Sequence, residues 1–320
     1  MENAKTASKK TVIITGANAG LGYECARSIA KSAPDISIVI AGRNMERILS
    51  AAGQINKETG LESVSALVMD LASLSSIRNF INVFANAGLP PLHCLICNAG
   101  IHPGRTIRVT QDGFEAAFGV NYLGHFLLTN LLIPHMAEGA RILMVSSRTH
   151  DYRDVSPFPK PVYRSPGILA DPIPPRGESI QTFLGKAYST SKLCQTMFAF
   201  ELERRIQESG GKLSVNVFDP GGMVTDLTRE FHPAVRTMMR GVWPVVRILP
   251  NMSTPKQSAA FMGDLAVSEK FEGVTGKYFT MIGSYKKGAR QAEPSPLVMD
   301  REKTAELWEG SGKLTGLEQG

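Results

Sequence analysis

Several classes of protein are excluded by what this chain has little of. Four cysteines in 320 residues are too few for the disulfide framework of a small secreted scaffold. No uninterrupted apolar run approaches the ~18–20 residues that cross a membrane, and the best candidate, 126–134, is interrupted by Thr129 and Asn130. The amino-terminal residues are polar and have no apolar signal-peptide core. We therefore expect a cytoplasmic protein without a transmembrane segment.

The chain also has only a small excess of charge of one sign. The formal net charge is only +6, and the basic residues form no block of the kind that nucleic-acid-binding proteins concentrate on one face. A small basic surplus fits an anionic small ligand equally well, so the charge alone does not decide between partners. We predict no nucleic-acid partner.

Metal-binding patterns are equally weak. The six histidines show no ligand spacing, and Cys94 and Cys97 lie in an apolar run that is typical of a strand. Residues three apart in a strand point to opposite faces, so buried strand cysteines are favoured over a zinc or redox pair. We predict no metal site.

What the sequence does contain is a regular alternation of short apolar runs and longer amphipathic stretches. Near-continuously apolar runs predict strands that are covered on both faces. The predicted strands are 11–15, 36–41, 64–69, 92–97, 141–145 and 213–218, and the predicted helices are 23–32, 45–57, 75–87, 114–133 and 187–207. This order predicts an α/β fold with a doubly wound parallel sheet of the Rossmann type.

The length of the chain is compatible with one domain, and we expect 1–320 to form a single dinucleotide-binding and catalytic domain. Two regions break the alternation. Residues 148–187 contain seven prolines and no helical periodicity, which predicts an insertion loop, and 223–250 is rich in methionine and arginine, which favours a hydrophobic substrate lid over an ordinary surface helix. Residues 286–320 are expected to form a C-terminal tail.

The turn after the first strand predicts a dinucleotide site. Residues 15–22 contain three glycines and open a helix, which lets the backbone approach a pyrophosphate at free N–H groups. The spacing of the glycines is not the commoner G-x-G-x-x-G, and the strand–turn–helix context strengthens the signal. The residues of this turn that we expect to bind the cofactor are Gly16, Asn18, Ala19, Gly20, Leu21 and Gly22.

The end of the second strand predicts which dinucleotide is bound. A site for NAD normally offers a carboxylate there, whereas this chain has Arg43 and Asn44 and no acid before Glu46. A guanidinium holds a 2′-phosphate bidentately, so we predict NADPH/NADP+ as the cofactor. Turns at the ends of the next two strands are expected to complete the site, through Asp70, Leu71, Asn98, Ala99 and Gly100.

The most specific chemical signal is Tyr188 followed four residues later by Lys192 on a predicted helix. The two side chains share one helix face. A phenol with a pKa of about 10 is a poor proton shuttle at neutral pH, and an adjacent ammonium is expected to lower that pKa. Taken alone, this spacing is common on exposed helices.

Together with Asn121, Ser146-Ser147 and Pro220-Gly221, these motifs occur in the order typical of the short-chain dehydrogenase/reductase family, which residues 10 to 285 resemble. The resemblance implies that Tyr188 donates a proton to the substrate oxygen and that Ser147 hydrogen-bonds that oxygen. Lys192 would hold the nicotinamide ribose and lower the pKa of Tyr188, and Asn121 would position a relay water. Pro220, Gly221, Val224 and Thr225 resemble the segment that binds the nicotinamide carboxamide.

Within this family the chain is most similar to the branch of retinol dehydrogenases and light-dependent protochlorophyllide reductases, through residues 121–126, 191–194 and 307–317. The resemblance implies reversible, NADPH-dependent reduction of a ketone or aldehyde. Light-driven C=C reduction is an alternative, although Gly222 stands where the photoenzyme has a cysteine. A third alternative is a non-catalytic NADPH-binding sensor.

The predicted partner is a small hydrophobic carbonyl or alcohol substrate, because 223–250 is rich in Met and large aliphatic residues. Peripheral membrane contact through 229–247 and assembly into a homo-oligomer both stay open.

Overall fold

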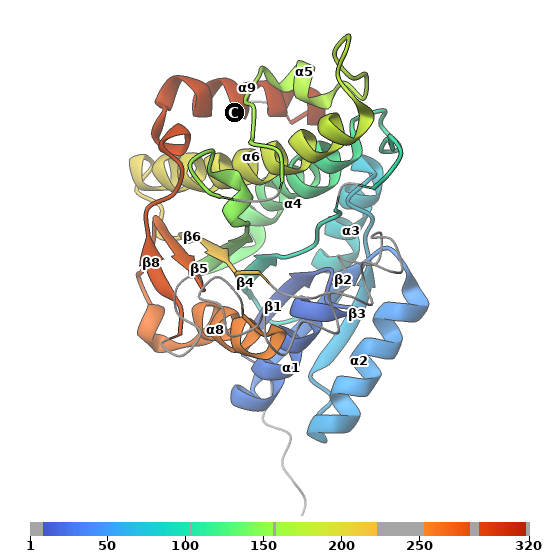
Figure 1. Ribbon diagram of the computed structural model, residues 1–320. Helices are drawn as coiled ribbons and strands as arrows, with labels where there is room; N and C mark the ends of the chain where they lie inside the picture. Colours follow the sequence, from blue (N-terminus) through green and yellow to red (C-terminus); the bar gives the residue numbers. More distant parts are fainter. Residues whose placement is uncertain (1–8, 103, 156–157, 223–252, 282–287, 318–320) are drawn as a thin grey trace, which may run out of the picture.

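One eight-stranded sheet organises the part of the chain that the structure describes (Figure 1). The computed structural model describes residues 9–102, 104–155, 158–222, 253–281 and 288–317, so the predicted lid at 223–250, with Val224 and Thr225, lies outside the described residues. The strands are β1 Lys10–Thr15, β2 Ile36–Gly42, β3 Val64–Val68, β4 Leu92–Cys97, β5 Met136–Val145, β6 Ser214–Asp219, β7 Lys277–Thr280 and β8 Arg290–Ala292.

The order of the strands is β3-β2-β1-β4-β5-β6-β7-β8, and every neighbouring pair is parallel except β7 with β8. The chain moves outward from β1 to β3 and then returns to the other side of β1, so the order reverses between β1 and β4. Ligands of such sheets bind at this reversal, outside the carboxyl ends of the strands. The predicted α/β, doubly wound fold is confirmed.

Helices cover both faces of the sheet (Figure 1). The longer ones are α1 Gly20–Ser32, α2 Met45–Thr59, α3 Leu74–Ala85, α4 Gly124–Leu132, α6 Ile180–Glu208, α8 Pro255–Val267 and α9 Arg301–Thr315. Short helical segments are η1 Phe118–Leu123, η2 Ile133–His135, η3 Arg148–His150, α5 Pro166–Ala170, η5 Glu269–Phe271 and η6 Pro296–Met299. Helices α1, α2 and α8 build one apolar core against the sheet, and α3, α4, α6 and α9 build the other.

The two strand cysteines confirm the alternation of faces. Cys94 belongs to the core under α1 and α8, whereas Cys97 belongs to the core under α4 and α6. Both are fully buried free thiols, as the strand interpretation predicts.

Several predicted boundaries were wrong; β5, for example, begins at Met136 and not at residue 141. Helix α6 begins at Ile180, seven residues before the predicted start, because Ser179 caps it by accepting from Thr182 N. Tyr188 therefore lies in the third turn of α6 and not at its start. The predicted helix at 114–133 is a π-helical turn, η1, continued by α4. Part of the predicted insertion loop is helical, as η3, α5 and the start of α6.

The segment expected to be a C-terminal tail adds structure to the sheet and to one core. Strand β8 pairs with β7, and α9 buries Leu307 in the core under α4 and α6 and packs Trp308 against the rings of Phe126 and Phe198. Arg205 of α6 lies over the Trp308 ring at 4.4 Å and strengthens the same contact.

We expect the core under α4 to dominate stability. Leu128 of α4 is fully buried, so Leu128→Ala should lower the free energy of unfolding by about 2–5 kcal/mol through lost burial and a residual cavity. Leu49→Ala is the matched control, because Leu49 is 53% exposed and should change stability by less than about 0.5 kcal/mol. Urea unfolding of both variants measures the difference, and equal losses would contradict the assignment of this core.

Candidate active site

The residues predicted to bind a dinucleotide lie at the carboxyl ends of β1 to β4. Thr15 ends β1 and joins it to the turn after β4, because its Oγ1 accepts from both Asn98 N and Ala99 N at 2.9 Å. Asn98 returns the contact by donating from Nδ2 to Thr15 O at 2.8 Å. The two turns that flank the reversal of strand order are thus fixed to each other.

The glycines of the first turn are required by close backbone approach. A Cβ on Gly16 would lie 2.9 Å from Ala99 Cα, and Gly16 has a φ of +67°, a conformation that favours glycine. A Cβ on Gly22 would lie 2.5 Å from Asn98 Nδ2 and 2.9 Å from Ala17 Cα. Side chains at these positions would separate the two turns.

Helix α1 begins in this turn without a side-chain cap. Its N-cap is Ala19, no side chain accepts from its first N–H groups, and no acidic residue lies in its first turn. By contrast, Asn44 caps α2 and Ser73 caps α3. Uncapped N–H groups at a helix start suit an anion such as a pyrophosphate.

The predicted residues after β2 and β3 have different surroundings. Arg43 is exposed directly after β2, and Asn18 lies close by, with its Oδ1 4.0 Å from the position of a Cβ on Gly42. Asn44 also serves as a cap, since its side chain accepts from Arg47 N at 2.9 Å. Asp70 accepts from Ala72 N at 2.9 Å, which shapes the turn after β3.

Asn121 links the cofactor side of the site to α6. It is fully buried in the π-helical turn η1, where its Oδ1 accepts from Ile101 N at 2.7 Å and its Nδ2 donates to Ser191 Oγ at 3.0 Å. Gly100 lies beside it, because a Cβ there would be 3.3 Å from Asn121 Oδ1 and 3.7 Å from Lys192 Nζ. π-Helical turns inside helices are frequent at functional sites.

The structure distinguishes the two serines after β5. The Ser147 side chain lies close enough to Tyr188 to lower the pKa of its phenol, whereas Ser146 turns toward α6, with its Oγ 2.8 Å from Thr196 Oγ1 and 3.2 Å from Lys192 O. The arrangement therefore brings Ser147 and Tyr188 together, in the pairing that the resemblance implies.

The predicted lowering of the Tyr188 pKa is wrong for this structure. Burial raises the pKa of Tyr188 to about 12, with the nearby Ser147 side chain acting against the rise and the charge of Asp219 adding to it. The Lys192 ammonium donates instead to Val145 O at 2.9 Å and to Gln195 Oε1 at 3.1 Å. Burial lowers the pKa of Lys192 to about 8, and the charge of Asp219 opposes that shift.

Two residues near this site were not predicted from the sequence to be functional. Asp219, at the end of β6, is buried and accepts from Tyr278 Oη at 3.2 Å, Thr280 Oγ1 at 3.0 Å and Gly221 N at 3.0 Å, which fixes the start of the Pro220–Gly221 turn. An acid that directly follows the apolar pair Val217-Phe218 at the end of a predicted strand was the available signal. His125 is fully buried between Asn121 O, 2.9 Å from Nδ1, and Thr15 Oγ1, 3.0 Å from Nε2.

Aromatic rings surround Tyr188. The rings of His102 and Phe158 have centroids 5.1 Å and 5.6 Å from that of Tyr188 and 5.1 Å from each other. Phe158 comes from the predicted insertion, so that segment contributes directly to the surroundings of the phenol.

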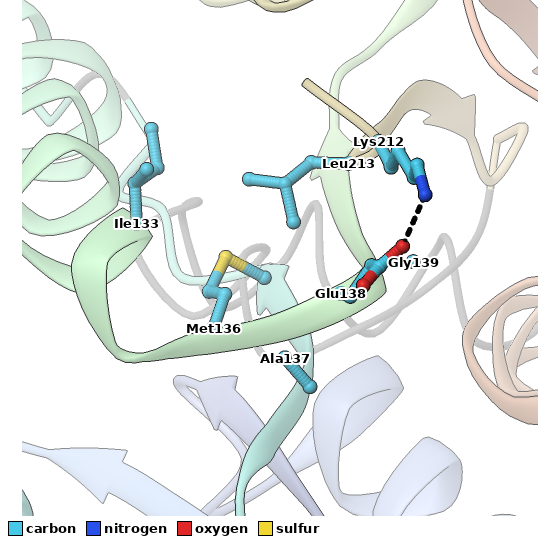
Figure 2. Close-up of a pocket in the computed structure, with 7 residues that line it drawn as sticks. All are labelled: Ile133, Met136, Ala137, Glu138, Gly139, Lys212 and Leu213. Carbon is cyan, nitrogen blue, oxygen red and sulfur yellow. Dashed lines mark hydrogen bonds and ion pairs between the residues drawn. The ribbon is translucent and has the colours of Figure 1, made fainter. Parts of the chain in front are cut away.

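A separate pocket of about 340 Å³ lies at the opposite edge of the sheet (Figure 2). It is found where β5 and β6 begin, and Glu138 and Lys212 form an ion pair there. Its lining residues are Ile133, Met136, Ala137, Glu138, Gly139, Lys212 and Leu213. Because the site residues follow the carboxyl ends of the strands, this pocket is not part of the candidate site.

Within the described ranges, no three His, Cys, Asp or Glu side chains cluster as metal ligands would, so the prediction of no metal site is left as a prediction. The same part of the chain contains no helix whose length and apolar character would let it cross a bilayer.

Comparison with known proteins agrees with this geometry. Residues 10–156 match the family model described as short chain dehydrogenase. Human retinol dehydrogenase 13 is 36% identical, with 97% of this chain and 85% of that protein covered. Mouse polyprenol dehydrogenase is 33% identical over 96% of this chain and 84% of that protein, and the zebrafish (Danio rerio) WW domain-containing oxidoreductase is 34% identical over 96% and 68%.

Among solved structures, an uncharacterised protein from Mycobacterium paratuberculosis superposes with a TM-score of 0.71 at 27% identity, covering 97% of this chain and 95% of that one. L-Sorbose reductase from Gluconobacter frateurii, solved with NADPH and L-sorbose, gives a TM-score of 0.62 at 20% identity, covering 88% and 98%. At that identity the second likeness concerns the fold alone.

The glycine turn offers a test with a matched control. Gly22→Ala should destabilise the protein by about 1–3 kcal/mol and weaken dinucleotide binding, because the new methyl group meets Ala17 and Asn98. Gly53→Ala, inside α2 with nothing within 4 Å of the added Cβ, should instead stabilise by about 0.5–1 kcal/mol and leave binding unchanged. Urea unfolding and NADPH fluorescence titration measure both effects, and wild-type behaviour of Gly22→Ala would show that the close approach is not needed.

Proposed function

This chain belongs to the short-chain dehydrogenase/reductase family of oxidoreductases, and we propose that it reduces the ketone or aldehyde group of a hydrophobic substrate with NADPH. The observation that carries the proposal is the placement of the Ser147 side chain next to Tyr188, whose pKa it lowers, with the buried Lys192 one helical turn beyond Tyr188 on α6. These three groups, placed at the carboxyl edge of the sheet, can bind a carbonyl oxygen and deliver a proton to it.

The cofactor proposal rests on the fit of the first two turns. Uncapped N–H groups of α1 and the side-chain-free backbone of Gly16 and Gly22 suit a pyrophosphate. Arg43, exposed after β2, would hold a 2′-phosphate through charge-assisted hydrogen bonds. When bound, the reduced nicotinamide supplies the hydride.

The protein residues supply orientation and the proton. Because burial keeps the pKa of Tyr188 at about 12, its hydroxyl is protonated at neutral pH and is ready to donate to a carbonyl oxygen that becomes an alkoxide. Ser147 donates a second hydrogen bond to the same oxygen and orients it. Lys192, one helical turn beyond Tyr188, carries the positive charge that compensates the phenolate left behind.

The substrate class is supported by the relatives and by the rings around Tyr188. Relatives of this chain are named retinol dehydrogenase and polyprenol dehydrogenase, names that refer to unsaturated, apolar alcohols. The rings of His102 and Phe158 lie next to the phenol ring, with centroids 5.1 Å and 5.6 Å from it. This aromatic surface suits an unsaturated chain next to the reacting carbon. We therefore propose long-chain isoprenoid aldehydes and alcohols as the first substrates to assay.

The role of Tyr188 can be tested by removing its hydroxyl. Tyr188→Phe should lower kcat/KM for aldehyde reduction by about 100-fold or more, because the proton donor is lost while the aromatic ring stays. Tyr152→Phe is the matched control, since Tyr152 is 45% exposed and should retain full activity. NADPH consumption is followed by absorbance.

The same assay distinguishes the proposed reaction from light-driven reduction and from a non-catalytic NADPH sensor. NADPH affinity of Tyr188→Phe should match that of the wild type, which excludes loss of folding as the cause. Running the wild type in darkness and under illumination tests light-driven reduction, because the proposed reaction needs no light. Retained turnover in Tyr188→Phe would overturn the proposed mechanism, and no turnover of any carbonyl by the wild type would favour the NADPH sensor.

Cofactor preference depends on Arg43 in this proposal. Arg43→Ala should weaken NADPH binding by about 10- to 100-fold, through the loss of charge-assisted hydrogen bonds to the 2′-phosphate, and leave NADH binding nearly unchanged. Arg47→Ala, an exposed arginine one turn further on, should alter neither. Equal affinities of the wild type for NADH and NADPH would contradict the assignment.

A further inference from the structure

Lys192 is a charged group held in the interior, and its hydrogen bonds explain how it is tolerated there. Its side chain is buried in α6, and the ammonium donates to the carbonyl of Val145 and to the side-chain oxygen of Gln195. A buried ammonium needs such acceptors, because burial disfavours the charged form. Of these two acceptors, Val145 O is a backbone atom of β5, so Gln195 is the one whose presence depends on the type of residue at its position.

Gln195 is unusual in its own right. It is fully buried in α6, where the residues next to it along the helix include the buried Thr196 and the buried apolar side chains of Cys194, Met197 and Phe198. Among the described residues its Nε2 has no hydrogen-bond partner. An unsatisfied buried donor costs stability, so an apolar side chain of similar size would suit this position better if packing were its whole role.

The orientation of the amide follows from Lys192. An ammonium has three donors and no acceptor, so it can pair only with the oxygen of the Gln195 amide. Turning the amide over would place two donor groups against each other. The orphaned N–H is thus the consequence of presenting Oε1 to Lys192 Nζ at 3.1 Å.

We propose that Gln195 is a positioning residue for Lys192, whose ammonium it holds against the Val145 carbonyl and keeps charged inside the site. The inference rests on the proposed function only for the part that Lys192 plays in turnover. The contact itself, and its effect on the protonation of Lys192, are properties of the protein alone.

Other charged and titratable groups around Lys192 set the background for this effect. The charge of Asp219 on β6 favours the ammonium form of Lys192, and Tyr188 lies on α6, the helix that also carries Lys192. His125 on α4 is neutral, because burial lowers its pKa to about 4. None of these groups changes when Gln195 is replaced, so a change in Lys192 protonation reports the amide oxygen.

The direct test measures the protonation of Lys192 in two variants. In Gln195→Met the acceptor is lost, and the pKa of Lys192 should fall below its value of about 8 by roughly one unit. In Gln195→Glu a carboxylate faces the ammonium, and the pKa should rise. NMR titration of protein labelled with 13C at lysine Cε measures both, with Lys192→Met identifying the signal.

Activity gives the second readout. Below its pKa Lys192 is an ammonium and above it is neutral, so the alkaline limb of carbonyl reduction should move to lower pH in Gln195→Met and to higher pH in Gln195→Glu. Gln207→Met, an exposed glutamine on the same helix, is the matched control and should leave both the titration and the pH profile unchanged.

The outcomes separate this inference from the proposed function. A Lys192 pKa that is the same in wild type, Gln195→Met and Gln195→Glu overturns the positioning role, whatever the activities are. If the pKa shifts as expected but Lys192→Met retains full turnover, the positioning role stands and the proposed part of Lys192 in the reaction fails. Thermal melting is expected to show Gln195→Met at least as stable as the wild type, since the orphaned N–H is gone, and a large loss of stability with no pKa shift would assign Gln195 to packing alone.

Discussion

The hydroxyl of Thr15 is the contact on which the geometry of the site depends most. It accepts two backbone N–H groups from the turn after β4 and pairs with the imidazole of His125 on α4. His125 in turn contacts the backbone oxygen of Asn121, whose side chain reaches Ser191 on α6. One side chain at the end of the first strand thereby relates the glycine turn, the π-helical turn and the helix that carries Tyr188.

The second constraint is electrostatic. Lys192, in the middle of α6, and Asp219, at the end of β6, are both buried, and each is stabilised by groups that match its charge. Carbonyl and amide oxygens surround the ammonium, and two hydroxyls with one backbone N–H surround the carboxylate. The charge of Asp219 acts to raise the pKa of both Lys192 and Tyr188, which favours a charged lysine and a protonated tyrosine on the same helix.

Much of this arrangement could be predicted from the sequence, because it follows from local pattern and topology. The short, near-continuously apolar runs predicted strands β1 to β6. The carboxyl ends of these parallel strands bring Gly16, Asn98 and Ser147 to one edge of the sheet. Strands β7 and β8 have four and three residues, too short for a periodic signal. Helix α9 is positioned by the contacts of Trp308 with rings from two other helices, which no local pattern encodes.

Within the site, residue types and spacing predicted Tyr188 and Lys192 but not their protonation. The adjacent ammonium was expected to lower the pKa of the phenol, whereas burial is the largest influence on both groups and raises the pKa of Tyr188. His125 could not be found in advance, because its importance lies in a contact with Thr15, 110 positions away. Gln195 is only three residues from Lys192, but its role depends on the burial of that ammonium against Val145, which is 47 positions from Lys192. The resemblance selected Ser147 over Ser146; the physical basis of that choice is how the backbone turns after β5, which residue types alone do not show.

The buried, neutral His125 makes the stability of the fold sensitive to acid. Its imidazole has an ordinary pKa of 6.5, which burial lowers to about 4 in the folded protein, so an unfolded chain takes up a proton more readily than the folded one. The stabilising contribution of the neutral ring is therefore complete above pH 6.5 and declines as the medium is acidified toward pH 4. Since both ring nitrogens are occupied, by Thr15 and by Asn121, acidification would loosen the glycine turn and the π-helical turn together.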